Sequence, residues 1–262
     1  MKFWTVDAFT SKPFHGNPAA VILVDEFPED SLCQSIAAEF NLSETGFLKP
    51  LSPNHYQIRW FTPTTEIPLC GHGTLSSALV LRHENLINPS EAICLESLSG
   101  PLSVLCQDNQ FVLNFPLQKI GKSLETQAFC DLLDTPILTA QEALDILLLE
   151  LPHETNIYNF QVDLTKICLL PYRGLIITAA SNGQPHDFVS RFFTPKAGIN
   201  EDPVTGSAHC KLADYWQTKL GRSLFLAYQA SPRGGEMQIK IEGERVLLTG
   251  KGVLISTGQL YC

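Results

Sequence analysis

The stretches "RWFTP" at residues 59–63 and "RFFTP" at residues 191–195 repeat nearly the same five residues. Each copy is followed by glycines and small hydroxyl residues, in "LCGHGTLSSALVL" (69–81) and in "EDPVTGSAHCKLADYW" (201–216). Both copies predict a strand, a turn broken by proline, and then a helix that carries alanine and leucine. The repeat indicates a duplicated unit, and therefore two similar halves.

Length and composition agree with a folded protein of two moderate domains. A chain of 262 residues can bury about three quarters of its unfolded surface. Hydrophobic residues make up 44% of the sequence and charged residues 17%, which is an ordinary globular balance. Intrinsic disorder is therefore excluded.

The charge pattern limits the classes of partner. The formal net charge is −9 and no run of Lys or Arg occurs, so neither nucleic acid nor a membrane surface is an expected partner. The first residues, "MKFWTVDAFTSKPF", lack the apolar run of a signal peptide, and no apolar stretch reaches about 18 residues. We expect a cytoplasmic protein, and a homodimer is compatible with these features.

The cysteines and histidines do not form a metal-binding motif. The eight cysteines are scattered without a C-x-x-C pair, which predicts reduced thiols, most of them in the core. The adjacent His209 and Cys210 fall in a predicted helix, where their side chains diverge by roughly 100°. We therefore predict no metal site, and we assign no role to His209 or Cys210.

The first half is predicted to be mostly antiparallel sheet with two helices. The spacing of Leu32, Ile36 and Phe40 predicts an amphipathic helix over residues 29–40 that stops at Asn41. Short alternating stretches on either side, from "KFWTVDAF" to "QFVLNF", predict strands. The alternation lapses at about residue 118, which divides a first half, residues 1–118, from a second, residues 119–253. Residues 254–262 could return to the first half.

The second half is predicted to repeat this order of elements. Thr139 and Glu142 form a T-x-x-E capping box, which predicts a helix in "TAQEALDILLLELP" that ends before Pro152. Strands are predicted in "KICLLP", "GLIITAAS", "DFVSRFFTP" and the segments from "MQIKIEG" to "GVLISTG".

The glycine-containing turns of the two repeats are candidate anion-binding sites. A helix N-terminus presents free backbone N–H groups and a partial positive charge. With helices beginning near Thr74 and Ser207, Gly71, Gly73 and Gly206 would let a small carboxylate or an enolate-like oxyanion approach the backbone. Tight turns alone would explain glycines in one repeat, but their presence in both favours binding. Neither a dinucleotide-binding nor a P-loop motif occurs, and no Ser nucleophile elbow occurs either.

The candidate proton-transferring groups are carboxylates and a histidine. Glu44 follows a predicted helix, with Leu42 and Phe47 nearby, and a carboxyl group among apolar neighbours holds a proton tightly enough to return it to carbon. An exposed turn glutamate is the alternative. Asp202 could instead cap a helix, and His72 could be a hydrogen-bonded core histidine.

Six motifs in order resemble the phenazine biosynthesis PhzF-like isomerase family. They are "DAFTSKPFHGNPAAVILV", "IAAEFNLSETGFL", "IRWFTP", "LCGHGTLSSALVL", "DFVSRFFTP" and "GINEDPVTGSAHCKLADYW". The match extends over nearly the whole chain and is weakest between about residues 119 and 170. The resemblance implies the α+β fold of diaminopimelate epimerase, in which two pseudo-symmetric halves each wrap a mostly antiparallel β-barrel around a central helix. It also implies an active site in the cleft between them.

The resemblance also implies roles for particular residues and a reaction without a cofactor. The Glu of "SET", which is Glu44, corresponds to the family's acid/base, and His72 and Asp202 would assist proton handling or bind polar substituents. Backbone N–H groups of the remaining site residues would anchor a substrate carboxylate; these residues are Gly71, Gly73, Gly206 and Ser207. The expected reaction moves a proton between carbons of a small, cyclic carboxylic acid.

Two rival functions are weighed against this one. "CGHGT" also resembles the first motif of proline racemase, whose reaction needs a second thiol on the opposite face of the substrate. The second repeat places Pro203, or its neighbours Asp202 and Val204, where that thiol should be, and Cys210 lies farther along. The other rival is a non-catalytic metabolite-binding protein, against which the presence of Glu44, His72 and Asp202 argues.

Overall fold

The computed structural model describes residues 1–182 and 185–262, which form two compact units. Unit 1 comprises residues 1–115 and 247–262, and unit 2 comprises residues 116–246. Within the described residues, no helix combines the length and the apolar character needed to cross a bilayer.

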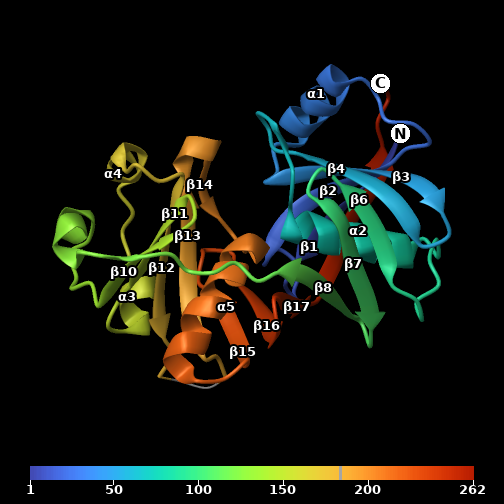
Figure 1. The fold of residues 1–262 in the computed structure, drawn as a ribbon. Helices are drawn as coiled ribbons and strands as arrows, with labels where there is room; N and C mark the ends of the chain where they lie inside the picture. The colour runs from blue at the N-terminus through green and yellow to red at the C-terminus, as the bar shows by residue number, and fades with distance from the viewer. Residues whose placement is uncertain (183–184) are drawn as a thin grey trace. The chain divides into compact units, whose positions relative to one another are not determined.

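Unit 1 is a sheet of mostly antiparallel strands around the helix α2 (Figure 1). Its elements are β1 (Lys2–Ala8), β2 (Asn17–Leu23), α1 (Asp30–Phe40), β3 (Glu44–Ser52), β4 (His55–Phe61), β5 (Glu66–Ile67), α2 (Gly71–His83), β6 (Ile93–Ser97), β7 (Gly100–Gln107), β8 (Gln110–Pro116) and β18 (Gly252–Gln259). The strand β18, near the end of the chain, pairs with β1. Helix α2 contacts β1, β2, β3, β7 and β18, and ten of its thirteen residues are buried, so it is the central element of the unit.

Unit 2 contains the corresponding helix α5. Its elements are β9 (Ser123–Leu124), the 3-10 helix η1 (Thr126–Leu132), β10 (Thr139–Ala143), β11 (Ile146–Glu150), α3 (Glu154–Tyr158), α4 (Leu164–Leu169), β12 (Gly174–Ala180), β13 (Phe188–Thr194), η2 (Pro195–Ala197), β14 (Ile199–Asp202), α5 (Gly206–Leu220), β15 (Leu224–Gln229) and β16 (Gly235–Glu242), while β17 (Arg245–Gly250) crosses the boundary between the units. Trp216 of α5 is buried, stacks on Phe188 at 5.3 Å between ring centroids and donates to the Thr178 hydroxyl.

The two units share one order of strand pairing. In unit 1, β1–β2 is antiparallel, β2–β3 parallel, β3–β4 antiparallel and β4–β6 parallel. In unit 2, β10–β11, β11–β12, β12–β13 and β13–β15 repeat this sequence of directions. Each unit inserts a short strand and then its central helix before the last strand of that series. The fold class expected from the sequence is therefore confirmed.

The repeated "RWFTP" and "RFFTP" motifs form the strands β4 and β13 and carry the same ion pair. Arg59 donates two hydrogen bonds to Glu66, both of 2.7 Å, and its guanidinium lies 5.0 Å from the centroid of Phe61. Arg191 donates two to Glu201, of 2.7 and 2.8 Å, and lies 5.0 Å from the centroid of Phe193. The duplicated Arg and Phe thus attach each strand to the chain that leads to the central helix.

Several predicted elements are confirmed. The helix expected over residues 29–40 is α1, and Asn41 ends it in the left-handed conformation, with φ of 50°. Helix α1 packs Cys33, Ile36 and Ala37 in a hydrophobic cluster with residues of β2 and β3. Helices follow both glycine turns, but α2 begins at Gly71 rather than near Thr74, so its glycines lie in the first turn.

Two predictions in unit 2 are wrong. The helix expected from the capping box of Thr139 and Glu142 is instead the antiparallel pair β10–β11. All five residues of β11 are buried, and the strand lies between β10 and the parallel β12; its apolar run, residues 146–149, suits such a strand as well as a helix. The strand expected in "KICLLP" belongs largely to α4, which begins after Asp163, a side-chain cap for the Lys166 N–H.

The repeated ion pair gives a prediction about stability. Arg191 is buried, and it also donates a 2.8 Å bond to the Phe160 carbonyl. Replacing it by alanine leaves the Glu201 carboxylate without its partner, so Arg191→Ala should lower the free energy of unfolding by about 3–5 kcal/mol. Arg173, which pairs with Asp145 at the surface, provides the control, because Arg173→Ala should cost no more than about 1 kcal/mol. Urea denaturation measures both, and equal losses would contradict the assignment.

Candidate active site

Three chain segments of unit 1 bring polar side chains to one point. Asn17 begins β2, Glu44 begins β3, and His72 lies in the first turn of α2. Because β2 and β3 are parallel, with Ala19 opposite Glu44, the first residues of the two strands lie at the same end of the sheet. Helix α2 packs against both strands, and its first turn lies at this end.

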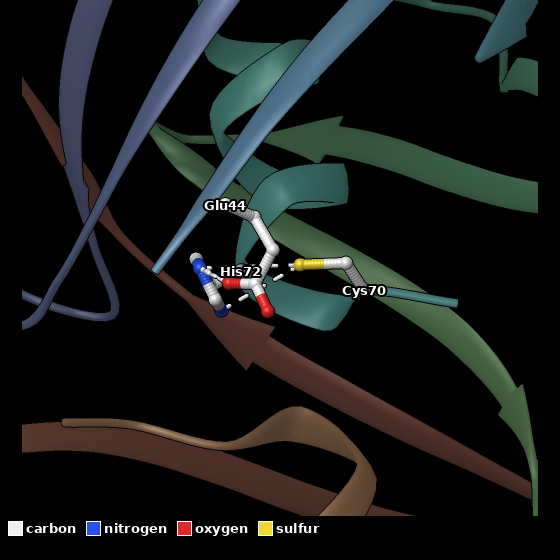
Figure 2. A group of neighbouring side chains, drawn as sticks. All are labelled: Glu44, Cys70 and His72. Atoms are coloured by element: carbon white, nitrogen blue, oxygen red, sulfur yellow. Dashed lines mark hydrogen bonds and ion pairs between the residues drawn. The ribbon is translucent and has the colours of Figure 1, made fainter. Parts of the chain in front are cut away.

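Glu44 and His72 form a buried ion pair. The Oε2 atom of Glu44 lies 2.6 Å from Nε2 of His72, and the exposed fractions of the two side chains are 9% and 4%. Figure 2 shows the carboxylate directed at the imidazole, with Cys70 on another side of the group. The prediction that Glu44 and His72 belong to one site is thus consistent with their geometry, and Glu44 is not an exposed turn residue.

Asn17 orients the imidazole from its other side. Its amide nitrogen lies 3.0 Å from Nδ1 of His72. In a neutral ring this amide donates to Nδ1, so the ring proton is on Nε2, the nitrogen in contact with Glu44. In a doubly protonated ring the amide must turn to present its oxygen. Asn17 was not predicted as a site residue, although it lies in the motif "FHGNPAAV".

Two opposing effects set the pKa of His72. Burial disfavours the imidazolium and acts to lower the pKa, whereas the negative charges of Cys70, when ionised, and of Glu44 act to raise it. The net direction is well above the usual value. Burial raises the pKa of the Cys70 thiol itself to about 11, so at neutral pH the thiol is protonated and Glu44 supplies the charge that favours the imidazolium.

Cys70 has a structural position at the start of α2. It is the N-cap residue, and its sulfur accepts a hydrogen bond from the Gly73 N–H at 3.2 Å. The sulfur lies 3.7 Å from Nδ1 and 3.9 Å from Nε2 of His72, nearly equidistant, so it is not aligned with either ring N–H direction. The thiol therefore contacts the imidazole without a directed hydrogen bond.

The glycines of this turn differ in what they offer a ligand. The N–H group of Gly73 is already bonded to Cys70, and a Cβ at position 73 would approach Trp60 to 2.8 Å. Gly73 is therefore required by close packing, and in this conformation it is not a ligand donor. The N–H groups of Gly71 and His72 belong to the first helical turn, which has no intrahelical acceptor for them.

The predicted residues of unit 2 form a separate polar group at the start of α5. The Asp202 carboxylate accepts a bond from the Thr205 hydroxyl, and Thr205 is the N-cap residue of α5, which begins with Gly206 and Ser207. Gln229 accepts from the Thr205 N–H at 2.8 Å and donates to the Asp202 carbonyl at 2.6 Å. Sequence reasoning missed Thr205 and Gln229; Asp202 acts on α5 through Thr205 rather than as its cap.

His209 and Cys210, which had no predicted role, are buried in α5. Nδ1 of His209 donates to the Thr205 carbonyl at 2.8 Å, and burial lowers the pKa of the ring to about 4. Burial raises the pKa of the Cys210 thiol to about 12. Both side chains are therefore neutral at neutral pH, in contrast to the charged pair of unit 1.

The first residues of α2 and α5 occupy equivalent places in the two units, and they show where a second thiol would have to lie. Cys70 is the N-cap of α2, and the N-cap of α5 is Thr205, so Thr205 and not Pro203 or its neighbours occupies the equivalent place. Threonine is not a thiol, and the two-thiol mechanism remains incomplete.

Glu44, Cys70 and His72 also have the side-chain types that can hold a metal ion, with donor atoms within 4.8 Å of one another. The carboxylate and imidazole are already bonded to each other and Cys70 accepts from the Gly73 N–H, so ligation would have to break these contacts. A carboxylate and an imidazole in contact are the types of group that can exchange a proton.

Comparison with known proteins identifies the family of this chain. Residues 6–258 match the model of the family described as phenazine biosynthesis-like protein. An uncharacterized isomerase of Pseudomonas aeruginosa is 43% identical, over 99% of this chain and 98% of its own. The crystal structure of a PhzF family phenazine biosynthesis protein from Enterococcus faecalis superposes with a TM-score of 0.94 at 37% identity, covering 100% of this chain and 99% of that one.

A more distant structure shows how widely the fold occurs. A probable proline racemase from Agrobacterium radiobacter has a TM-score of 0.65 at 10% identity, over 99% of this chain and 92% of its own, which is a likeness of fold alone. The extensive matches at higher identity are specific. The chain therefore belongs to the phenazine biosynthesis-like (PhzC–PhzF) family and is an isomerase.

Proposed function

We propose that this isomerase moves a proton between carbons of a small, cyclic carboxylic acid, with Glu44 as the acid/base. The observation that carries the proposal is the buried pair of Glu44 and His72 at the first turn of α2. A carboxylate that is held against an imidazole, and away from bulk water, can take a proton from one carbon and deliver a proton to another.

The reaction can be written in two proton transfers. Glu44 removes a proton from a ring carbon, and the electron pair of that C–H bond enters the conjugated system that ends at an oxygen of the substrate. Protonated Glu44 then gives the proton to a different ring carbon, the double bonds shift, and the residue returns to its carboxylate. No oxidant or reductant is consumed, and a cofactor is not required for this balance.

His72 would act by controlling the charge of Glu44. Its Nε2 atom lies 2.6 Å from Oε2, so the protonated ring would stabilise the carboxylate before the first transfer, and Asn17 keeps the ring in this orientation. The N–H groups of Gly71 and His72 would bind an anionic oxygen of the substrate with the partial charge of the helix end. This local charge would have to outweigh the repulsion from the net charge of −9.

For unit 2, considered by itself, we propose that Asp202 binds a polar substituent or handles a proton. The N–H groups of Gly206 and Ser207 would anchor an anionic oxygen. The hydrogen bonds among Asp202, Thr205 and Gln229 support this assignment because they hold the start of α5 in one arrangement. Binding without catalysis is the alternative function.

Hydrogen exchange distinguishes catalysis from binding. In deuterated water the enzyme should introduce deuterium at a ring carbon of at least one member of a set of cyclic carboxylic acids, because protonated Glu44 exchanges its proton with solvent in a fraction of turnovers, before the second transfer. NMR or mass spectrometry measures the exchange. Glu44→Gln keeps the shape of the side chain but removes the base, so the exchange rate should fall by about 100-fold or more.

Glu39, on the exposed surface of α1, provides the matched control for this substitution. Glu39→Gln should exchange at the wild-type rate. A folded Glu44→Gln protein with near wild-type exchange would refute the assignment of the base, and a wild-type protein that binds these acids without exchange would favour the binding protein.

Cys70 is predicted to be dispensable for the chemistry. Cys70→Ser keeps an acceptor for the Gly73 N–H, and serine is a good N-cap, so most of the activity should remain. At neutral pH the protonated Cys70 thiol should react only slowly with iodoacetamide. Rapid inactivation through Cys70 that substrate prevents, together with an inactive Cys70→Ser variant, would revive the racemase function.

The protonation states of two histidines provide a test that needs no substrate. An NMR pH titration of the imidazole groups should place the pKa of His72 above its ordinary value and that of His209 below it, because the two are displaced in opposite directions. The pair of His72 and Glu44 then stabilises the fold fully below about pH 6.5, and this contribution is lost as the pH rises through the raised pKa of His72. In Glu44→Gln the pKa of His72 should fall; an unchanged value would contradict the pairing.

A further inference from the structure

The outer face of the sheet in unit 1 carries a second group of side chains that could bind a metal ion. This group lies on β4 and β6, whereas Glu44 belongs to β3 and His72 to α2. His55 is the first residue of β4, and Cys94 and Glu96 lie in β6. The strands are parallel, and His55 is the direct neighbour of Cys94. Glu96 lies two residues beyond Cys94 and therefore projects from the same face.

The burial pattern shows which face this is. Tyr56 and Leu95, which alternate with these residues, are buried at 5% and 0% exposure, so the three ligand-type side chains project away from the core. The side chains of His55 and Glu96 are 36% and 41% exposed. A metal ion from solvent can reach this face without any movement of the core.

The distances between the side chains are close to those of a tetrahedral zinc site. Nε2 of His55 lies 3.0 Å from Oε1 of Glu96, and Sγ of Cys94 lies 3.9 Å from the same oxygen. The donor atoms of all three lie within 4.8 Å of one another. Bond lengths of about 2.0–2.3 Å to zinc imply separations of about 3.4–3.6 Å between tetrahedral ligands. Small side-chain rotations are enough to reach these values.

We propose that His55, Cys94 and Glu96 bind one Zn²⁺ ion, with water as the fourth ligand. An imidazole, a thiolate and a carboxylate suit zinc, whereas calcium and magnesium prefer oxygen ligands alone. The thiol proton of Cys94 passes to solvent as the metal–sulfur bond forms. The ion would bind across β4 and β6, where the backbone pairing already fixes the positions of the ligands.

The backbone ladder is the reason that this group differs from a chance surface cluster. The Asn54 carbonyl accepts the Cys94 N–H at 2.8 Å, directly before the pairing of His55 with Cys94. Cys94 also pairs with Ser103 on its other side, so β6 is held between two strands. Two of the ligands therefore come from one rigid strand and the third from its neighbour, and little conformational entropy is lost on binding.

Titration with Co²⁺, a coloured substitute for Zn²⁺, tests the proposal on the full-length, reduced protein. One equivalent should produce a thiolate-to-cobalt charge-transfer absorption with visible bands of tetrahedral cobalt, and Zn²⁺ should displace it, whereas excess Mg²⁺ should not. Cys94→Ser should abolish the charge-transfer absorption. His55→Gln and Glu96→Gln should each weaken binding by at least about 10-fold.

Two matched variants separate this site from other thiols. Cys168 is free and exposed, so Cys168→Ser should leave the titration unchanged. Cys70 belongs to the group at the active site, and Cys70→Ser should also retain the signal. The proposal is overturned if no charge-transfer absorption develops, or if it survives Cys94→Ser and disappears with Cys70→Ser or Cys168→Ser. Circular dichroism of each variant verifies that the fold is intact, so loss of signal reports on the ligand.

Discussion

The contact between Glu44 and His72 is the interaction on which the geometry of the candidate site depends. A carboxylate that is removed from water loses hydration worth several kcal/mol, and a partner at 2.6 Å offsets part of that loss. The partner is itself buried, so it must be oriented by Asn17 from the opposite side.

The positions of these side chains follow from the direction of two strands and one helix. Parallel pairing of β2 and β3 brings Asn17 and Glu44 to the same end of the sheet, and the packing of α2 against these strands brings His72 there. Gly73 permits this approach, because a larger residue would collide with Trp60. The active site is therefore a consequence of how the central helix fits into its sheet, and not of a flexible loop.

Duplication produced two similar scaffolds, whose helix starts have different chemistry. Both units keep the bidentate Arg–Glu pair, with Arg59 in one and Arg191 in the other. At the helix N-cap, however, unit 1 has Cys70 beside an ionised pair, and unit 2 has Thr205 in a network of neutral donors with Asp202. His209 is kept neutral by burial. The strand pairing is shared because it depends on the backbone, whereas the few side chains at each helix end diverged.

The sequence by itself determined the duplicated fold, the helices after the glycine turns and the family. These features depend on local signals: the repeated aromatic strand, the spacing of Leu32, Ile36 and Phe40, and six motifs in order. It also pointed to Glu44 and His72, but only the tertiary structure shows them in contact, because Glu44 begins β3, His72 lies in α2, and the packing of the helix against the strand brings them together. Residues 146–150 form a strand that is buried on both faces of the sheet. The sequence could not show this, because the apolar run at residues 146–149 has no periodicity that separates a strand from a helix. Asn17, Gln229 and the group of His55, Cys94 and Glu96 were likewise decided by strand register, which brings together residues that no sequence motif connects.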